Sequence, residues 1–536
     1  MGREGTIPQS WFRWLGLTAA CAVLLVLCAR YWQPAVPFVL AVTGLLLTWW
    51  LATKVTTDRV CVRLIVWSYV AKIVLAMALY YPALYQWPIF PGYHGGDGFW
   101  VFADDAELHH TLGWRLVDAW KGNGAFPRID VGNWSFPFYV AVLYYLLGVH
   151  PLSVSFLNAW YGTGGTVAGL FIMQRLGAEP LSRRLGVLVL AFWPSLLLWA
   201  SQPMKDQAIL TLVMVGLALL MSLVDGRERR TVWLFGLASC FWLTIVPLQL
   251  LRGYTALALT LTAVAAFTVL AVRALMRRSL GVCGRFLVLV PMTALVLVLA
   301  SKVDFKTIFG PAEKEETSSL IAESMLAPSS PEQALMIPSS SGGSQSAVAV
   351  QSERPFGSVG RHLEGLVSKR LEELEGFRRG FISTGGNSLI DEEIRLQRLG
   401  DALDYLPRAL SVAFLGPFPW QWFDTSGSTR WFRSLTAIEM VLIYLLLIGF
   451  VARSAHLRWY AGRHIAIILL FATIVAVPMC LSVPNIGTLF RLRLQFLLPL
   501  FLLVCLVGVP GVYRRTATWL WSAISRRRKT PAVSTP

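Results

Sequence analysis

Charged residues are scarce in this sequence. They make up 14% of its 536 residues, against about 25% in soluble domains, and 55% of the residues are hydrophobic. A mean hydropathy of +0.58 agrees with this composition. We therefore interpret the chain as a polytopic membrane protein rather than as a series of soluble domains.

Cysteine is also scarce, and its placement argues against two kinds of site. The seven cysteines lie in or beside apolar segments, and none has the CxxC spacing of zinc or redox centres. Neither a disulfide framework nor a zinc site is expected. The cysteines are interpreted as small buried hydrophobic residues.

Acidic residues are outnumbered by basic ones, and the formal net charge is +17. In a soluble protein this excess would suggest nucleic acid. Here most basic residues lie at the ends of apolar segments, where they orient membrane spans. No basic and aromatic stripe or known module accompanies them. We therefore expect membrane lipids, whose anionic headgroups attract such ends, and no nucleic acid as partners.

Apolar stretches near 20 residues are long enough to cross a bilayer. About twelve of them occur here, and they predict an all-α fold with about twelve transmembrane helices. Their approximate ranges are 11–29, 37–53, 64–87, 152–174, 185–201, 207–224, 232–250, 253–274, 284–301, 433–452, 464–482 and 494–513.

A further run at 134–149 decides the orientation. It is short, contains Pro137 and is rich in aromatic residues. If it does not span and the N-terminus is cytoplasmic, most basic clusters face the cytoplasm, as the positive-inside rule requires. If it spans, the later clusters lie outside. We therefore expect this run to lie along the interface or to re-enter the membrane. The clusters then placed in the cytoplasm include Arg175 with Arg183 and Arg184, and Arg453 with Arg458 and Arg463.

This orientation divides the chain into six parts. Three N-terminal spans (1–87) precede a first outer loop (88–151), six spans (152–301), a second outer loop (302–432), three spans (433–513) and a basic cytoplasmic tail (514–536). In the first loop, leucines recur every four residues between Asp105 and Lys121, which predicts an amphipathic helix. In the second loop, 313–353 is rich in Ser, Pro and Gly and is expected to lack a core. Helices are predicted at 360–381 and 391–414.

Acidic and basic residues from distant parts of the sequence share the outer face in this topology. They are Asp97, Asp104, Asp105, Glu107, His109, His110, Lys205, Asp206, Arg252, Tyr254, Glu439, Asn485, Arg491 and Arg493. A carboxylate among them suits a general base that deprotonates an acceptor hydroxyl. Arginine binds phosphate as a bidentate fork and lysine as a point charge. Fixed cations also stabilise a departing phosphate where water is scarce.

The acidic residues have simpler interpretations as well. Asp104 and Asp105 open the predicted helix, where acids favour the helix N-terminus. Lys205 and Asp206 can form a surface ion pair that caps the next helix. Both the structural and the catalytic interpretation stay open for these four residues, and they do not exclude each other.

The arginines and histidines also have more than one interpretation. Arg252, Arg491 and Arg493 lie on the side that disfavours cations, which indicates phosphate binding, but they can also snorkel to lipid headgroups. His109 and His110 are adjacent and point in different directions on a helix. They therefore predict no metal site, although a divalent cation held by the acids stays open.

Short motifs along the chain add a resemblance. They are Asp104-Asp105, Trp120-Lys121-Gly122-Asn123-Gly124, Pro137-Phe138-Tyr139 to Tyr145-Leu146-Leu147-Gly148, Leu157-Asn158-Ala159, Phe192-Trp193-Pro194-Ser195 before Lys205-Asp206, and Asn485-Ile486-Gly487-Thr488 before Arg491. In this order they resemble the GT-C superfamily of membrane glycosyltransferases. More narrowly, it is similar to bacterial family-39-like and phospholipid-carrier-dependent glycosyltransferases. The resemblance covers about 88–225 and is weaker near the C-terminal end.

The resemblance implies a GT-C-like fold and an inverting transfer of sugar from a polyprenyl-phosphate donor to a glycan, lipid or protein acceptor. It implies that Asp104 or Asp105 is the base, on the outer face of a bacterial inner membrane. The residues then expected to bind the substrates are Lys205, Asp206, Arg252, Arg491, Arg493 and His109. The second long loop lies between spans, whereas many members carry their soluble domain after the last span. The type of acceptor therefore stays open.

Two other functions remain open from the sequence. A polysaccharide polymerase or ligase that uses undecaprenyl-linked glycans would place its essential residues in a late outer loop, and 302–432 fits that position. A lipid or sugar transporter would show ionisable residues near mid-span and repeated halves. Mid-span charge is scarce here and no convincing repeat is found.

Overall fold

The chain is described by a computed structural model over residues 9–95, 97–127, 135–225, 231–302, 358–383, 389–422, 430–453 and 462–505. These ranges contain no strand, and their regular structure is helical. Within these ranges, five helices are long and apolar enough to cross a membrane, or up to eight if each bent pair counts as one span. The prediction of an all-α membrane protein is thus confirmed, and the count of about twelve spans stays a prediction.

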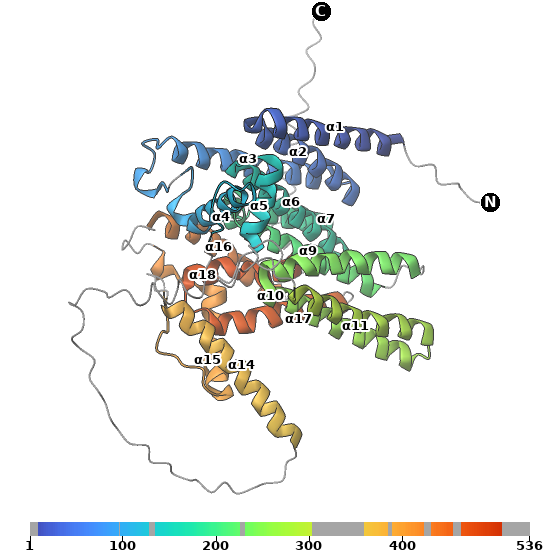
Figure 1. Ribbon diagram of the computed structural model, residues 1–536. Coiled ribbons are helices and arrows are strands. Elements are labelled where there is room, and N and C mark those ends of the chain that lie inside the picture. Colours follow the sequence, from blue (N-terminus) through green and yellow to red (C-terminus); the bar gives the residue numbers. More distant parts are fainter. Residues whose placement is uncertain are drawn as a thin grey trace, which may run out of the picture.

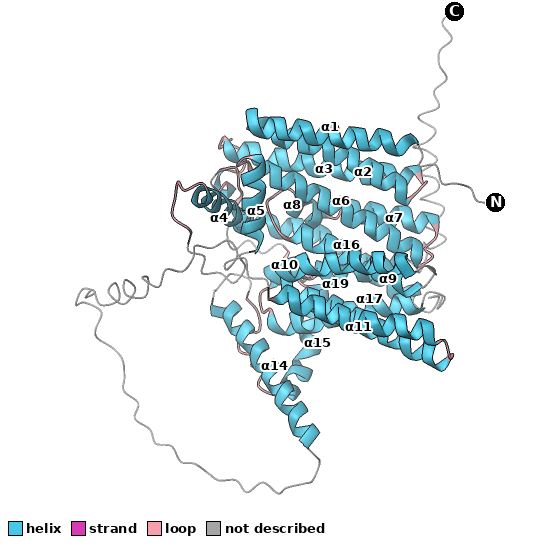
Figure 2. Cartoon of the chain, turned by 45° about the vertical axis from the view of Figure 1, so that its right-hand side comes forward, coloured by secondary structure: helices cyan, strands magenta, loops and turns pink. Residues whose placement is uncertain are grey.

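Most of the helices run side by side in one bundle (Figures 1 and 2). In chain order they are α1 (Gln9–Tyr31), α2 (Val36–Val55), α3 (Arg59–Leu84), α4 (Asp104–Trp120), α5 (Ser135–Leu147), α6 (Pro151–Arg175), α7 (Pro180–Ala191), α8 (Pro194–Ala200), α9 (Asp206–Asp225), α10 (Thr231–Met276), α11 (Leu280–Ser301), α14 (Ser358–Ser383), α15 (Leu399–Leu415), α16 (Arg430–Arg453), α17 (Gly462–Ser482), α18 (Ile486–Leu492) and α19 (Leu494–Val504). Figure 2 shows α4 and α5 at one end of the bundle.

Within the run at 134–149, Ser135–Leu147 form α5, which meets α6 at an angle of 115°. Gly148 ends α5 with φ +90°, a left-handed conformation that glycine adopts without steric cost. Pro151 then opens α6, because a proline at the first helical position lacks only an N–H that would be unpaired anyway. The angle prevents α5 from continuing the direction of α6.

α10 is a helical hairpin. A straight helix of its 46 residues would be about 69 Å long, more than twice the hydrocarbon core of a bilayer. Arg252 interrupts it with φ −162° and ψ 86°. A Cβ atom at Gly216 of α9 would lie 2.6 Å from Leu259 and 3.3 Å from Thr244. Both arms of α10 therefore approach the same point, and the chain folds back at Arg252.

Ion pairs gather several helix ends at the other end of the bundle. The Asp225 carboxylate at the end of α9 binds Arg175 at the end of α6 (2.6 Å) and Arg463 at the start of α17 (2.7 Å). Arg184 of α7 binds Asp58, which caps α3, at 2.7 Å. The opposite end of α6 adjoins α5, and the opposite end of α9 is linked to α4 through Arg491. Polar residues that are far apart in the sequence are thereby brought to one region.

The two polar loops contain helices close to those expected. α4 matches the amphipathic helix predicted after Asp105, and α14 matches the helix predicted at 360–381. The prediction of a helix over 391–414 is wrong at its start, since α15 begins at Leu399. Asp391 has φ +50°, and the carbonyls of Asp391 and Ile394 accept hydrogen bonds from Arg378 instead of continuing a helix. The ranges 313–353 and 514–536 lie outside the described residues.

Gly216→Val should destabilise the protein, because the added side chain would clash with both arms of α10. Overpacking of this kind costs about 1–3 kcal/mol. We expect a lower melting temperature in thermal unfolding followed by tryptophan fluorescence in detergent. The control is Gly236→Val on α10, where a Cβ atom would meet nothing within 4 Å. Equal shifts in the two variants would contradict the hairpin packing.

Candidate active site

α4 presents two of the predicted site residues on one face. Asp105 and His109 are separated by one helical turn, so they point the same way. The His109 ring is buried against Phe136, with ring centroids 4.7 Å apart, and its Nδ1 lies 3.3 Å from the Pro203 carbonyl oxygen. Because a carbonyl can only accept, Nδ1 carries the hydrogen in this contact. His109 therefore docks α4 on the segment that precedes α9.

That segment, 201–205, is held by an amide inside the bundle. Asn158 of α6 donates from Nδ2 to the carbonyls of Gln202 and Met204, each at 2.8 Å. Gln207 of α9 donates to the Leu196 carbonyl of α8 at 2.8 Å. These bonds satisfy backbone carbonyls where α8 has ended, as a membrane interior requires. They also fix the position of Asp206, the first residue of α9.

A chain of ion pairs connects four separate elements. Arg491 Nη1 in the last turn of α18 lies 2.6 Å from Asp105 Oδ2, a residue 386 positions away. Arg491 Nε lies 3.5 Å from Asp206 Oδ2, which is an ion pair without a hydrogen bond. Arg252 Nη2, at the turn of α10, donates to Asp206 Oδ1 at 3.2 Å. Asp206 thus lies between two guanidinium groups.

The exposure of the two carboxylates differs. The side chain of Asp206 is 5% exposed, whereas that of Asp105 is 45% exposed. Among the described residues, Asp105 Oδ1 has no hydrogen-bond partner, so one oxygen of this carboxylate is open to solvent or substrate. Asp206 is enclosed by protein, and Asp105 forms the accessible side of the group.

Lys205 adds a buried cation. In the described part of the chain, no carboxylate forms an ion pair with its ammonium group within 4.0 Å. Burial and then the charge of Arg252 lower the pKa of the Lys205 ammonium to about 8, although Asp206 and Asp105 act in the opposite direction. Burial, followed by the charge of Lys205, lowers the pKa of His109 to about 4. The ring of His109 is therefore neutral at pH 7.

The charge balance of the site favours an anion. It holds three cations, Lys205, Arg252 and Arg491, and two carboxylates, Asp105 and Asp206, so the formal sum is 3 − 2 = +1. A buried cation is unfavourable unless a partner neutralises it. A phosphate or another oxyanion would supply that partner and would also bond to the arginines.

The remaining predicted residues lie elsewhere. Arg493 is 1% exposed and donates to the carbonyls of Ala413 (3.3 Å) and Gly416 (2.5 Å). Its closest carboxylate is Glu439, at 3.9 Å. It contacts none of the residues around Asp105, so the structure does not bring it into the site. Asp104 is the first residue of α4, and its side chain lies outside the described part of the structure.

Two amides of the site carried no separate prediction. Asn158 entered only as part of a resemblance motif, and Gln207 was not singled out. Gln495 of α19 was also missed; it accepts from Thr255 Oγ1 at 2.5 Å and donates to the Tyr254 hydroxyl at 3.2 Å. The sequence did offer a way to find these residues. An amide side chain within an apolar stretch is energetically costly in a membrane unless it is hydrogen-bonded, so each one indicates a polar contact.

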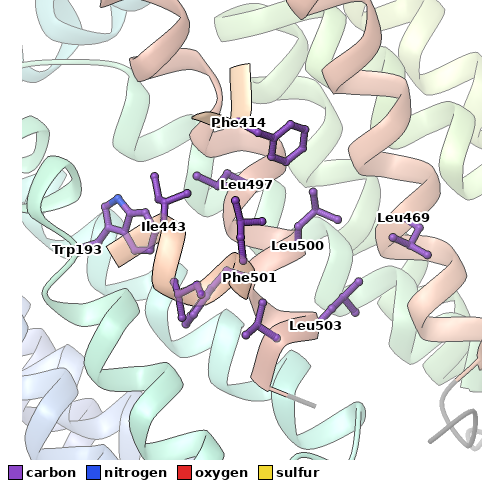
Figure 3. A pocket seen from close by; sticks show the side chains of 11 residues that line it. Trp193, Phe414, Ile443, Leu469, Leu497, Leu500, Phe501 and Leu503 are labelled. Carbon is purple, nitrogen blue, oxygen red and sulfur yellow. The ribbon is translucent and has the colours of Figure 1, made fainter. Parts of the chain in front are cut away.

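An apolar cavity of about 190 Å³ lies between α15, α16, α17 and α19, beside Trp193 at the N-cap of α8 (Figure 3). It is lined by Trp193, Phe414, Ile443, Leu446, Leu447, Leu469, Leu497, Leu500, Phe501, Leu503 and Val504. Phe414 lies between the two residues whose carbonyls bind Arg493, so this end of the cavity approaches the break between α18 and α19. The lining suits a hydrocarbon chain.

Metal ligands are not grouped in the same way. Among the described residues, no set of three or more His, Cys, Asp or Glu side chains is arranged to hold a metal ion. The two carboxylates of the site are bonded to arginines.

Comparisons with known proteins give no family for this chain. No family model, no curated protein and no solved structure matches it. The functional argument therefore depends on the chemistry of the residues themselves.

The two carboxylates should differ in their effect on stability. Asp206→Asn leaves two arginines without a full counter-charge, and breaking a buried ion pair costs about 3–5 kcal/mol. Asp105→Asn removes a half-exposed pair, which contributes under about 1 kcal/mol. We expect Asp206→Asn alone to lower the thermal midpoint of the purified protein strongly. Equal midpoints for the two variants would show that Asp206 is not the buried centre of the group.

Proposed function

We propose that this protein is a membrane glycosyltransferase that moves a sugar from a polyprenyl-phosphate carrier to a glycan, lipid or protein acceptor. The observation that carries the proposal is the group of Asp105, Lys205, Asp206, Arg252 and Arg491. It combines an accessible carboxylate with an excess of cations at one end of a bundle of apolar helices. The proposed location is the non-cytoplasmic face of a bacterial inner membrane, with both termini cytoplasmic.

The cations suit the leaving group of this reaction. The donor phosphate would bind Lys205 and the guanidinium groups of Arg491 and Arg252, since its charge compensates the excess positive charge there. A phosphate on Arg491 would compete with Asp105 for this guanidinium and would leave the carboxylate free to meet the acceptor.

The proposed step is a single displacement. Asp105 takes the proton of the acceptor hydroxyl, and the acceptor oxygen bonds to the anomeric carbon as the bond from that carbon to the phosphate oxygen breaks. The electron pair of the broken bond stays on the phosphate, whose growing charge the fixed cations stabilise. Attack opposite to the leaving group inverts the anomeric centre. Asp206 holds the two arginines in place without contacting the reacting atoms.

The cavity of Figure 3 supports a donor with a lipid tail. Arg491 and Arg493 lie on either side of Leu492, at the break between α18 and α19, and extended chain would span at most about 7 Å between them. The cavity approaches this break from the apolar side, and the charged group approaches it from the polar side. A phosphate at Arg491 and a prenyl chain in the cavity are therefore compatible with one donor molecule.

The other functions are less well supported. For a polymerase or ligase, the essential cations would come from the second outer loop. Arg378 in that loop instead donates hydrogen bonds to backbone carbonyls. For a transporter, buried mid-span charge is required, and Lys72 of α3 and Glu439 of α16 are buried inside described helices. Lys72 donates to Ser68 and to the Ala191 carbonyl and has no carboxylate partner within the described residues. Glu439 accepts from the Ser195 amide at 3.0 Å and lies 3.9 Å from Arg493. Neither pattern forms a second candidate site.

Asp105→Asn should abolish sugar transfer without weakening donor binding, because the variant removes a negative charge beside Arg491. Loss of a general base typically costs about 10²- to 10⁴-fold in rate. Transfer is measured from a radiolabelled polyprenyl-phosphate sugar in liposomes, and binding is measured with polyprenyl phosphate. Asp104→Asn is tested beside it, because the resemblance leaves both residues as candidates.

The control is Asp97→Asn. Asp97 is exposed and has φ +51°, a conformation that asparagine also tolerates, so this variant should keep full activity. Full activity in both Asp104→Asn and Asp105→Asn would rule out these two residues as the base.

The affinity for polyprenyl phosphate should fall as the pH rises above about 8. Lys205 is charged below its pKa of about 8 and neutral above it, so the attraction for an anion is present at pH 7 and is lost at higher pH. The phosphate itself is fully ionised throughout, because its second pKa is near 6. Because Lys205 loses one proton, the affinity can fall by up to about tenfold per pH unit above that pKa.

Lys205→Arg should hold the affinity constant up to about pH 10, because arginine stays charged there. The exposed residue Lys121 supplies the control, and Lys121→Arg should leave the fall in place. A fall that persists in Lys205→Arg would assign the titration to another group.

A further inference from the structure

α18, the short helix that carries Arg491, is held at both ends by the second outer loop. It contains only seven residues, so it has little stability of its own and depends on what fixes its ends. Arg491 lies in its last turn. The loop elements that contact its surroundings are α14, the segment 389–398 and α15.

Arg378 of α14 fixes the chain before α18. Its side chain is fully buried, and its guanidinium donates to the Leu481 carbonyl (3.2 Å), the Ile394 carbonyl (3.4 Å) and the Asp391 carbonyl. It also lies 5.1 Å from the centroid of the Tyr405 ring. The charge therefore has carbonyl oxygens and an aromatic face as partners, with no carboxylate among the described residues.

The Leu481 contact matters for α17. Leu481 is the penultimate residue of that helix, and the last carbonyls of a helix have no partner within it. A cation at this position both satisfies the carbonyl and interacts favourably with the helix dipole. Because its planar fork carries five donors, Arg378 can bond this carbonyl and the two loop carbonyls at once. It thus joins the loop to the end of α17.

Backbone pairing continues the contact up to the start of α18. The Ile390 amide donates to the Pro484 carbonyl at 2.8 Å, and Leu389 pairs with Asn485 in an isolated antiparallel bridge. Asn485 is the N-cap of α18, and its side chain accepts from the Thr488 amide at 3.0 Å. The residue that starts α18 is therefore paired directly with the loop.

Arg493 fixes the other end. It follows the last residue of α18, and it donates to the Ala413 and Gly416 carbonyls at the end of α15. Its guanidinium lies 4.2 Å from the centroid of the Phe490 ring on α18 itself. The predicted phosphate ligand Arg493 instead binds α15 to α18.

We propose that the second outer loop is a clamp that positions Arg491, with Arg378 as its main positioning residue. The assignment of phosphate to Arg491 rests on the proposed function, but the clamp itself does not. The contacts fix α18 before and after Arg491, so a shift of the loop moves the guanidinium relative to Asp105 and Asp206. Displacement of a binding group by about 1 Å is enough to weaken a precise contact strongly.

Hydrogen exchange tests the clamp without any substrate. Arg378→Met should raise deuterium uptake in the peptide 483–493, because α18 loses its fixed start. Arg378→Lys should raise this uptake too, since a compact ammonium cannot reach all three carbonyls that the wide guanidinium fork contacts. This variant keeps the positive charge, so it also serves as the test if Arg378→Met fails to fold. Arg370→Met is the matched control, because Arg370 is on the same helix and its side chain is 74% exposed. Uptake equal to that of the control would overturn the clamp.

A double-mutant cycle tests whether Arg378 acts through Arg491. The probe is undecaprenyl phosphate, whose Kd is measured for the full chain in detergent. Arg491→Gln should raise the Kd about tenfold or more, as expected for loss of a charged hydrogen-bond donor. Arg378→Lys should raise it about fivefold in the natural background, and should raise it no further in the Arg491→Gln background. If Arg378 acted only on overall folding, Arg378→Lys would raise the Kd by the same factor with and without Arg491→Gln.

The outcomes separate the two proposals. If the Kd changes of Arg378→Lys and Arg491→Gln multiply in the double variant, the positioning role is overturned. If Arg491→Gln leaves the Kd unchanged while exchange in 483–493 rises in the Arg378 variants, the clamp is supported and the phosphate site of the proposed function is wrong.

Discussion

The burial of Asp206 between Arg252 and Arg491 is the interaction on which the site depends. A charge at the edge of a membrane is costly unless its partners are supplied with accurate geometry. Here the partners come from the turn of α10 and the last turn of α18, so neither helix can move without exposing a charge to apolar surroundings. The same constraint explains why helices are interrupted at this level. Asp206, Arg252 and Arg491 each lie at a helix end or turn, where free backbone groups need polar neighbours.

In the proposed reaction, the two carboxylates have different roles. Asp206 is enclosed, so it is suited to hold arginines and not to exchange protons with a substrate. Asp105 is half exposed and bonds to only one of these arginines, so it is suited to meet an acceptor. Because Arg491 touches both, an anion that binds this arginine changes the surroundings of Asp105 directly. A single carboxylate could not serve both purposes, because one that is enclosed to hold the arginines cannot also be exposed to the acceptor.

Hydropathy predicted most helices, because the length of an apolar run determines whether it can cross a bilayer. The asymmetry of basic residues brought Asp105, Lys205, Asp206, Arg252 and Arg491 to one face. The sequence could not predict the direction in which each side chain points. Arg491 and Arg493 are two positions apart, and only the break between α18 and α19 shows that one turns to Asp105 and the other to α15. Arg378 lies among alternating charges typical of a solvated helix, although its side chain is fully buried.

The break after Leu492 joins the polar and apolar halves of the proposed donor site. A continuous helix there would place Arg491 and Arg493 about 200° apart around one axis, along a single cylinder. The 52° bend instead separates a helix that faces the charged group from a helix whose leucines line the cavity. A lipid-linked phosphate has the same division, with charge at one end and hydrocarbon at the other. A bend fixed by Arg493 and the second outer loop therefore matches such a molecule better than a straight span would, since each half of the break meets its own kind of partner.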